Sequence, residues 1–93
     1  MASAVIRIPT PLRRATNGQE TADVDGGSLQ DALTQLETQF PGVKERIIDD
    51  ASGELHRFVN IYINNEDVRF LQGLETILND GDEISIVPAV AGG

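Results

Sequence analysis

The sequence predicts one α+β domain, in which a single main helix crosses a mixed sheet, followed by a flexible tail. Runs of residues that place apolar side chains on one face open and close the chain, and an apolar stripe with helical spacing lies between them. Two glycines end the chain shortly after the last of these runs. The 93 residues fit one domain with one modest core. We expect residues 1–88 to form the domain and residues 89–93 to form the tail.

The first half of the chain is typical of two strands followed by a helix. Residues 4–8 place three apolar side chains on one face and predict a strand, and residues 20–25 predict a second strand antiparallel to it. Ser28 is the expected N-cap of the helix, and the Phe-Pro-Gly run at 40–42 ends it. The apolar stripe of the helix consists of Leu29, Ala32, Leu33, Leu36 and Phe40.

The second half is typical of strands joined by short segments. Residues 43–48 predict a short helical segment, and residues 49–53 predict a loop. Residues 58–64 are rich in β-branched and aromatic side chains and give the strongest strand signal of the chain. The remaining expectations are an edge strand at 67–70, a helical turn that places Leu74, Ile77 and Leu78 on the core, a turn at 79–82 and a last strand at 83–87.

This order of elements favours one arrangement of the sheet. The first and last strands are free to pair in parallel at its centre, while the helix packs across one face. That is the β-grasp arrangement, and in it the chain leaves the sheet from its centre. The tail residues Val90, Ala91, Gly92 and Gly93 would then project freely.

A Gly-Gly end of this kind can deliver a carboxylate into the active site of another enzyme. Glycine has no Cβ, so Gly92 and Gly93 fit a channel that is too narrow for side chains. Residues 89–93 reach about 17 Å when extended, at about 3.3–3.6 Å per residue. A carboxylate must be activated before it acylates anything, and attack on the α-phosphate of ATP is a common route. Sulfide can then displace AMP and leave a thiocarboxylate on Gly93. The alternative is an inert, frayed tail.

Charge and composition exclude several classes of function. The net charge is −8, with 15 acidic residues against seven basic ones, so we expect a protein partner with a basic docking surface and no nucleic-acid partner. The chain has no cysteine, which excludes disulfides, thiolate metal sites and a cysteine nucleophile. Because His56 is the only histidine, we expect no metal site.

The size and hydropathy of the chain lead to further expectations. A domain this small leaves little room for a catalytic cleft, so we do not expect an enzyme. No long apolar run predicts a membrane span or a signal peptide, and we expect a cytoplasmic protein that is monomeric when free.

Several motifs extend the argument to a known family. The Asp80-Gly81-Asp82 turn before the last strand and the Gly92-Gly93 end resemble those of the ubiquitin-like sulfur carriers. That family includes the small subunit of molybdopterin synthase and the thiamine-pathway carrier. Residues 56–70, His-Arg-Phe-Val-Asn-Ile-Tyr-Ile-Asn-Asn-Glu-Asp-Val-Arg-Phe, and residues 88–93, Pro-Ala-Val-Ala-Gly-Gly, resemble more closely the sulfur carrier of the actinobacterial cysteine-biosynthesis pathway.

The resemblance implies a cycle that is shared with partner proteins. An E1-like adenylating enzyme would adenylate Gly93, and sulfur transfer would give the thiocarboxylate. A pyridoxal-phosphate-dependent cysteine synthase would use this sulfur to build cysteine on Gly93, and a zinc metalloprotease would release it. The resemblance therefore implies that ATP, magnesium, pyridoxal phosphate and zinc belong to the partners and that this chain has no cofactor of its own.

One face of the predicted sheet is a candidate docking surface. If Val59, Ile61 and Ile63 meet the helix, Phe58 and Tyr62 lie on the opposite face. Val87 is out of phase with the inward-facing isoleucines of the last strand and joins them, and we expect Leu12 of the first loop to lie nearby. Exposed apolar groups gathered in one patch favour a protein interface.

Other functions would use the same chain end. A protein modifier would form an isopeptide bond between Gly93 and a lysine of its target. Sulfur could instead be delivered to molybdopterin, to thiamine or to tRNA. Loss of Gly92 and Gly93 would abolish all of these functions, whereas it would leave an ordinary interaction domain unaffected.

Overall fold

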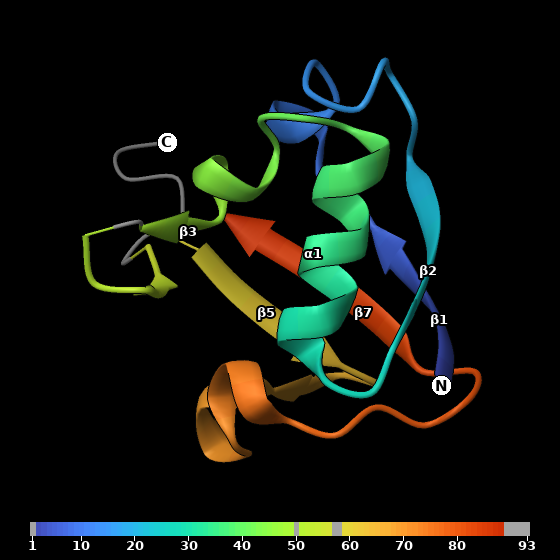
Figure 1. Ribbon diagram of the computed structural model, residues 1–93, viewed down its shortest axis with the longest axis vertical. Helices are drawn as coiled ribbons and strands as arrows, with labels where there is room; N and C mark the ends of the chain where they lie inside the picture. Colours follow the sequence, from blue (N-terminus) through green and yellow to red (C-terminus); the bar gives the residue numbers. More distant parts are fainter. Residues whose placement is uncertain (1, 50, 57–58, 89–93) are drawn as a thin grey trace.

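A five-stranded mixed sheet is the centre of the structure, a computed structural model that describes residues 2–49, 51–56 and 59–88. Strand β1 pairs with β2 in antiparallel and with β7 in parallel orientation, and β7 pairs with β5 in antiparallel orientation (Figure 1). This confirms the β-grasp arrangement. In spatial order the strands are β2 (Thr21–Gly26), β1 (Ala2–Arg7), β7 (Glu83–Pro88), β5 (Val59–Ile63) and β6 (Glu66–Asp67).

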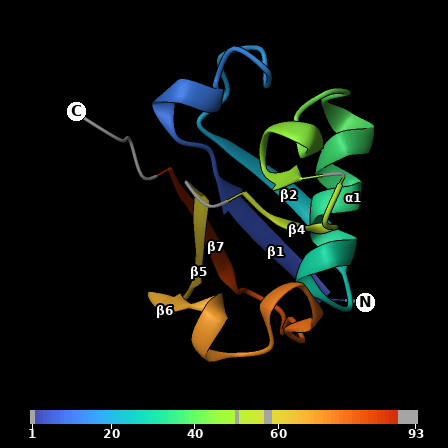
Figure 2. The ribbon, with the colours of Figure 1, turned by 90° about the vertical axis from the view of Figure 1, so that its left-hand side faces the viewer.

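Helix α1 (Leu29–Gln39) covers one face of the sheet, as Figure 2 shows from the side. Ser28 caps it, because the Ser28 hydroxyl accepts a hydrogen bond from the backbone N–H of Asp31. A Cβ on Gly26 would lie 2.8 Å from the Cβ of Asp31, so glycine at this position lets β2 pass close to the helix. The predicted apolar stripe of the helix is buried throughout, which confirms its orientation.

The core lies between α1 and the inward-facing side chains of four strands, β1, β2, β5 and β7. Alternation along each strand places every second residue in this layer. Each buried valine or isoleucine in this layer contributes on the order of 1.5–3 kcal/mol relative to an exposed position. From the sheet they are Ala4, Ile6, Ala22, Val24, Val59, Ile61, Ile63, Ile84 and Ile86, with Ile8 just beyond β1.

The segment after α1 contains a hairpin that the sequence did not predict. The 3-10 turn η2 (Lys44–Arg46) replaces the expected longer helical segment. Strands β3 (Ile48–Asp49) and β4 (Glu54–Leu55) then pair in antiparallel orientation around the expected loop. Strands of two residues are too short to show an alternation pattern, so the sequence could not reveal them.

The segment after β5 also differs from prediction. Instead of an edge strand over residues 67–70, β6 ends at Asp67, and the 3-10 turn η3 (Val68–Phe70) follows. The Asp67 carboxylate accepts a hydrogen bond from the Arg69 N–H at 2.9 Å, which favours the turn over a continued strand.

The turn expected near Leu74 is η4 (Gly73–Glu75), and Leu74 packs partly against the core. The expected burial of Ile77 is wrong, since its side chain is 65% exposed, whereas that of Leu78 is buried as expected. Residues 76–78 run extended beside Ser28, and alternation in this segment turns Ile77 outward and Leu78 inward.

Asp82 ties the end of β5 to the start of β7. Its buried carboxylate accepts one hydrogen bond from Nδ2 of Asn64 at 2.9 Å and one from the backbone N–H of Asn79 at 2.8 Å. The Asn64 side-chain oxygen in turn accepts the N–H of Glu83 at 3.0 Å. Asn64 and Asn65 both have positive φ, 51° and 72°, the conformation that a tight hairpin turn requires.

Glu37 closes the turn that follows α1. Its two carboxylate oxygens accept the backbone N–H of Gly42 at 2.8 Å and that of Lys44 at 2.9 Å. Gly42 has a φ of 98°, which glycine tolerates best. The hydrogen bonds from Gly42 and then Lys44 lower the pKa of Glu37 from its ordinary value of 4.5, because they favour the ionised carboxylate.

Asp82→Ala should lower the free energy of unfolding by about 1–3 kcal/mol, because it removes the buried carboxylate that accepts two part-buried hydrogen bonds. Urea unfolding followed by circular dichroism measures this loss. The matched control is Asp23→Ala at an exposed position of β2, which should change stability by no more than about 0.5 kcal/mol. Equal effects of the two substitutions would contradict the role assigned to Asp82.

The contribution of Glu37 to stability should depend on pH. Its folded-state pKa is lowered, so the contribution is fully present above the unfolded value of 4.5 and is lost as pH falls through the lower folded value. Urea unfolding of the unmodified chain and of Glu37→Gln, between about pH 6 and about pH 3, measures this dependence. The difference in stability between the two proteins should shrink toward acid pH. A difference that stays constant would show that ionised Glu37 does not hold the turn.

Candidate functional site

The described part of the chain ends with the central strand of the sheet. Strand β7 lies between β1 and β5, and its last residue, Pro88, pairs with Val59. Residues 89–93 follow, and the predicted site residue Gly93 and the tail residues Val90, Ala91 and Gly92 therefore lie outside the described residues. The structure places the position from which they depart.

The face of the sheet that points away from α1 carries the predicted docking residues Tyr62 and Val87. Both are out of phase with the buried isoleucines of their strands, which confirms their predicted orientation. The pairing places Tyr62 beside Ser85, and Ser85 beside Arg7. Val87 pairs with Asn60 and is 44% exposed. We call the set Val5, Arg7, Asn60, Tyr62, Glu83, Ser85 and Val87 the open face.

Two other predicted docking residues are not part of the described open face. Phe58 lies outside the described residues. Leu12 is only 9% exposed and belongs to the core, so its expected place on the surface is wrong. The 3-10 turn η1 (Thr10–Leu12) explains this, because the Leu12 N–H bonds back to the Pro9 carbonyl and the turn directs the side chain inward.

The open face is mixed in character rather than apolar throughout. At the end far from the tail, Arg7 of β1 and Glu83 of β7 form an ion pair at 3.1 Å. Both side chains are exposed to solvent, so the pair adds little stability. The apolar side chains are divided, with Val5 beside Glu83 at this end and Val87 at the end where the tail begins.

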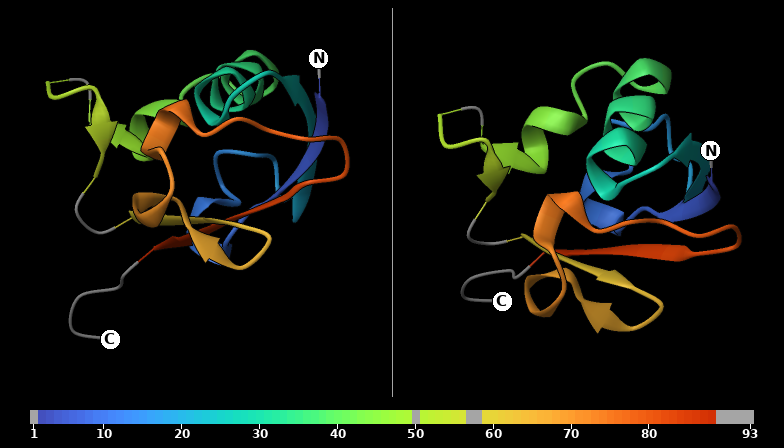
Figure 3. Two further views of the ribbon diagram at one scale, coloured as in Figure 1. Left: turned by 90° about the horizontal axis from the view of Figure 1, so that it is seen from below. Right: turned by 60° about the horizontal axis from the view of Figure 1, so that its bottom comes forward.

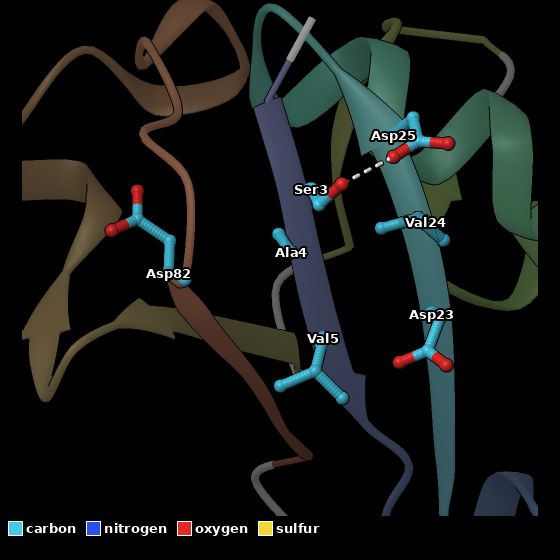
Figure 4. Close-up of a pocket in the computed structure, with 8 residues that line it drawn as sticks. Ser3, Ala4, Val5, Asp23, Val24, Asp25 and Asp82 are labelled. Carbon is cyan, nitrogen blue, oxygen red and sulfur yellow. Dashed lines mark hydrogen bonds between the residues drawn. The ribbon is translucent and has the colours of Figure 1, made fainter.

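An acidic trough of about 480 Å³ lies along the outer side of β1 and β2. Figure 4 shows Asp23 and Asp25 on β2, with Ser3 and Val5 on the neighbouring strand. The Ser3 hydroxyl donates to Asp25 at 2.8 Å. The exposed carboxylates suit a basic partner surface, as the net charge predicts. In the described part of the chain, no three side chains of His, Asp or Glu are grouped so that they could hold a metal ion.

A second groove, of about 580 Å³, lies between the β3–β4 hairpin and the η3–η4 segment. Figure 3 shows these two segments on the same side of the molecule, away from β2. Leu55, Arg69 and Leu74 are among its lining residues. Phe70, which follows Arg69 in the sequence, is 87% exposed. Sequence reasoning missed this surface, because it assigned Phe70 to a strand.

The candidate functional features among the described residues are therefore the open face, the acidic trough, the second groove and the end of β7. Within residues 2–49, 51–56 and 59–88, no helix is long and apolar enough to cross a bilayer. The first and last strands pair in parallel at the centre of the sheet, one helix crosses it, and the chain continues from the central strand. These features define a ubiquitin-like β-grasp protein.

The chain belongs to the ThiS family, whose family model matches residues 6–93. It is 49% identical over 92 residues to the sulfur carrier protein CysO of Mycobacterium tuberculosis, with 98% of this chain and 99% of the relative covered. It is 41% identical over 69 residues to the small archaeal modifier protein 3 of Haloferax volcanii, with coverage of 74% and 73%.

A solved structure is similar over nearly its whole length. A chain in the crystal structure of the BexX/CysO complex of Amycolatopsis orientalis superimposes with a TM-score of 0.91 at 41% identity. The match covers 97% of this chain and 99% of that one. The comparisons confirm the fold class and the resemblance to ubiquitin-like sulfur carriers that the sequence motifs indicated.

Proposed function

We propose that this chain is a sulfur carrier whose terminal glycine, Gly93, bears the sulfur as a thiocarboxylate. The observation that carries the proposal is the 49% identity to the sulfur carrier CysO over nearly the full length of both chains. The tail supports it, because Gly92 and Gly93 follow closely on a strand that ends at the centre of the sheet. In this role the chain is a co-substrate of other enzymes.

The chemistry needs only the carboxylate of Gly93 from this chain. One carboxylate oxygen attacks the α-phosphorus of ATP, pyrophosphate leaves, and an acyl-adenylate results. Hydrosulfide then attacks the carbonyl carbon, the C–O bond to AMP breaks, and AMP and one proton are released. The product is the Gly93 thiocarboxylate. Its dependence on ATP places the proposed chemistry in the cytoplasm.

The fold suits this delivery. Tail residues 89–93 reach about 17 Å beyond Pro88 when extended, so the carboxylate can enter a buried site while the domain stays outside. Glycine at the last two positions passes a narrow channel. The acidic trough and the open face offer docking surfaces on the domain itself.

We assign the sulfur to cysteine biosynthesis. The similarity of residues 56–70 and 88–93 to the actinobacterial carriers and the likeness to CysO support this acceptor. The partners would be an E1-like adenylating enzyme, a pyridoxal-phosphate-dependent cysteine synthase and a zinc metalloprotease that releases the cysteine. A chain in a BexX/CysO complex is similar to this one, which supports a function exerted through protein partners.

A protein modifier is the second candidate, because the chain is 41% identical to a small archaeal modifier protein over 69 residues. In that case the activated Gly93 carbonyl would be attacked by a lysine amine of a target protein, and AMP would leave. Both functions need the same adenylated end, so the product distinguishes them. Molybdopterin, thiamine or tRNA as the sulfur acceptor would likewise be distinguished by the product.

Intact mass of the protein purified from its native host tests the proposal. We expect a species heavier by the exchange of one oxygen for sulfur, localised to Gly93 by fragmentation, and a further species with a cysteinyl residue on Gly93. Gly93 carrying only a free carboxylate, even after incubation with ATP, sulfide and host extract, would contradict the carrier function. Adducts joined through a target lysine would favour the modifier instead.

Tyr62→Ala should weaken binding to the adenylating enzyme about tenfold or more, the scale of an interface hot spot. The reason is its half-buried place on the open face, across β7 from Arg7 and in β5, the strand that pairs with Val87 and Pro88. Calorimetric titration measures the affinity, and circular dichroism verifies the fold. Gln35→Ala, at an exposed position of α1, is the control and should bind normally. Normal binding by a folded Tyr62→Ala chain would rule out this docking surface.

A further inference from the structure

Arg69 lies at the edge of the sheet and bonds to the start of β5, which pairs with the end of β7, the strand that the tail follows. We propose that Arg69 is a positioning residue, which fixes this strand end and thereby directs the tail toward the partner enzyme. The inference rests on the proposed function, because it concerns how Gly93 is presented for adenylation.

The guanidinium of Arg69 holds the first two residues of β5. Its Nη1 donates to the side-chain oxygen of Asn60 at 2.6 Å, and its Nη2 donates to the backbone carbonyl of Val59 at 3.2 Å. These two residues pair with Val87 and Pro88, the last two residues of β7. The side chain of Arg69 therefore acts on the final pairs of the sheet before the tail.

The backbone of Arg69 is anchored at the other end of the same strand. Tyr62, near the end of β5, pairs with Asp67 of β6. The Asp67 carboxylate accepts the Arg69 N–H at 2.9 Å and starts the turn η3. Arg69 thus spans the outer edge of β5 from its end back to its beginning, as a strut between β6 and Val59.

The hydrogen bonds of the Arg69 guanidinium go to uncharged groups, whereas two other arginines form ion pairs. The two ion pairs in the described residues are Arg7–Glu83 and Arg13–Glu20, and Arg69 takes part in neither. It instead donates through two nitrogens to two uncharged oxygens. Only the rigid fork of a guanidinium presents two donors in this way, whereas a lysine ammonium is a point charge on a flexible stem.

The end of β7, from which the tail continues, is weakly held and would be stabilised by Arg69. The Val59 carbonyl and N–H bond to Arg69 and to the His56 carbonyl and not to Pro88, so the final pair of the sheet adds no hydrogen bond to the ladder between β5 and β7. A strand end that frays would let the five tail residues leave in many directions. A fixed end confines Gly93 to a smaller volume and raises its effective concentration at the mouth of a partner channel. Its loss should therefore act on productive binding and leave the chemical step unchanged.

Adenylation kinetics test the inference with five variants of the full chain. Pyrophosphate release by the purified E1-like adenylating enzyme of the native host is measured as a function of carrier concentration. Arg69→Ala should raise KM about tenfold, as expected for a lost charge-assisted hydrogen bond, with kcat unchanged. Arg69→Lys should give a value between Ala and the unmodified chain. Asn60→Ala is measured alone and combined with Arg69→Ala, and the combined effect should be smaller than the sum of the two single effects, because both remove the same strut. Arg14→Ala, which removes one positive charge from an exposed loop position, is the control and should leave KM unchanged.

A measurement without the partner separates positioning from direct contact. Amide hydrogen exchange at Asn60 and Val87 should be faster in Arg69→Ala than in the unmodified chain, while the midpoint of thermal unfolding stays within a few degrees. The positioning role would be overturned, with the proposed function intact, by any of three results. These are unchanged exchange, additive effects of Asn60→Ala and Arg69→Ala, and an unchanged KM of Arg69→Ala when the unmodified chain is active. Failure of the unmodified chain to be adenylated would overturn the proposed function and the inference with it.

Discussion

The parallel pairing of β1 with β7 is the constraint on which the rest of the structure depends. It brings the first and last strands side by side, although nearly the whole chain separates them. Parallel neighbours cannot be joined by a tight turn, so α1 and the shorter elements form the crossover. The buried Ile6, Ile84 and Ile86 beneath the helix favour this pairing. Because β7 is also held by β5 on its other side, the chain leaves the domain from its best-supported strand.

The main elements of the fold could be predicted because each is long enough to show a period. Six-residue strands with every second side chain buried, and an eleven-residue helix capped by Ser28, carry their own signals. The hairpin of Ile48–Asp49 with Glu54–Leu55 could not be predicted, since two residues have no period. The turn at Val68–Phe70 was hidden for another reason. There a single side chain, that of Asp67, decides between strand and turn.

The candidate site was predictable only in part. Tyr62 and Val87 followed from alternation, because the isoleucines beside them had to be buried. Leu12 was misplaced, because a short turn after Pro9 reverses the direction of the side chain. The reach of Arg69 to Val59 could not be seen at all. The hairpin between β5 and β6 reverses the chain, so that Arg69 lies beside the edge of β5 and reaches back to its first residue. The spacing of residues in the sequence does not encode that path.

The central place of β7 also has a mechanical consequence. A partner enzyme that grips residues 89–93 can pull on the domain only through Pro88. Because β7 is bonded to β1 on one side and to β5 on the other, such a force acts along the strand and loads the hydrogen bonds of both ladders together. Such a force cannot peel β7 away from an edge of the sheet, a process in which the hydrogen bonds break one after another. The geometry thus suits a carrier that is repeatedly inserted into channels and withdrawn from them, with its anchor intact after each cycle.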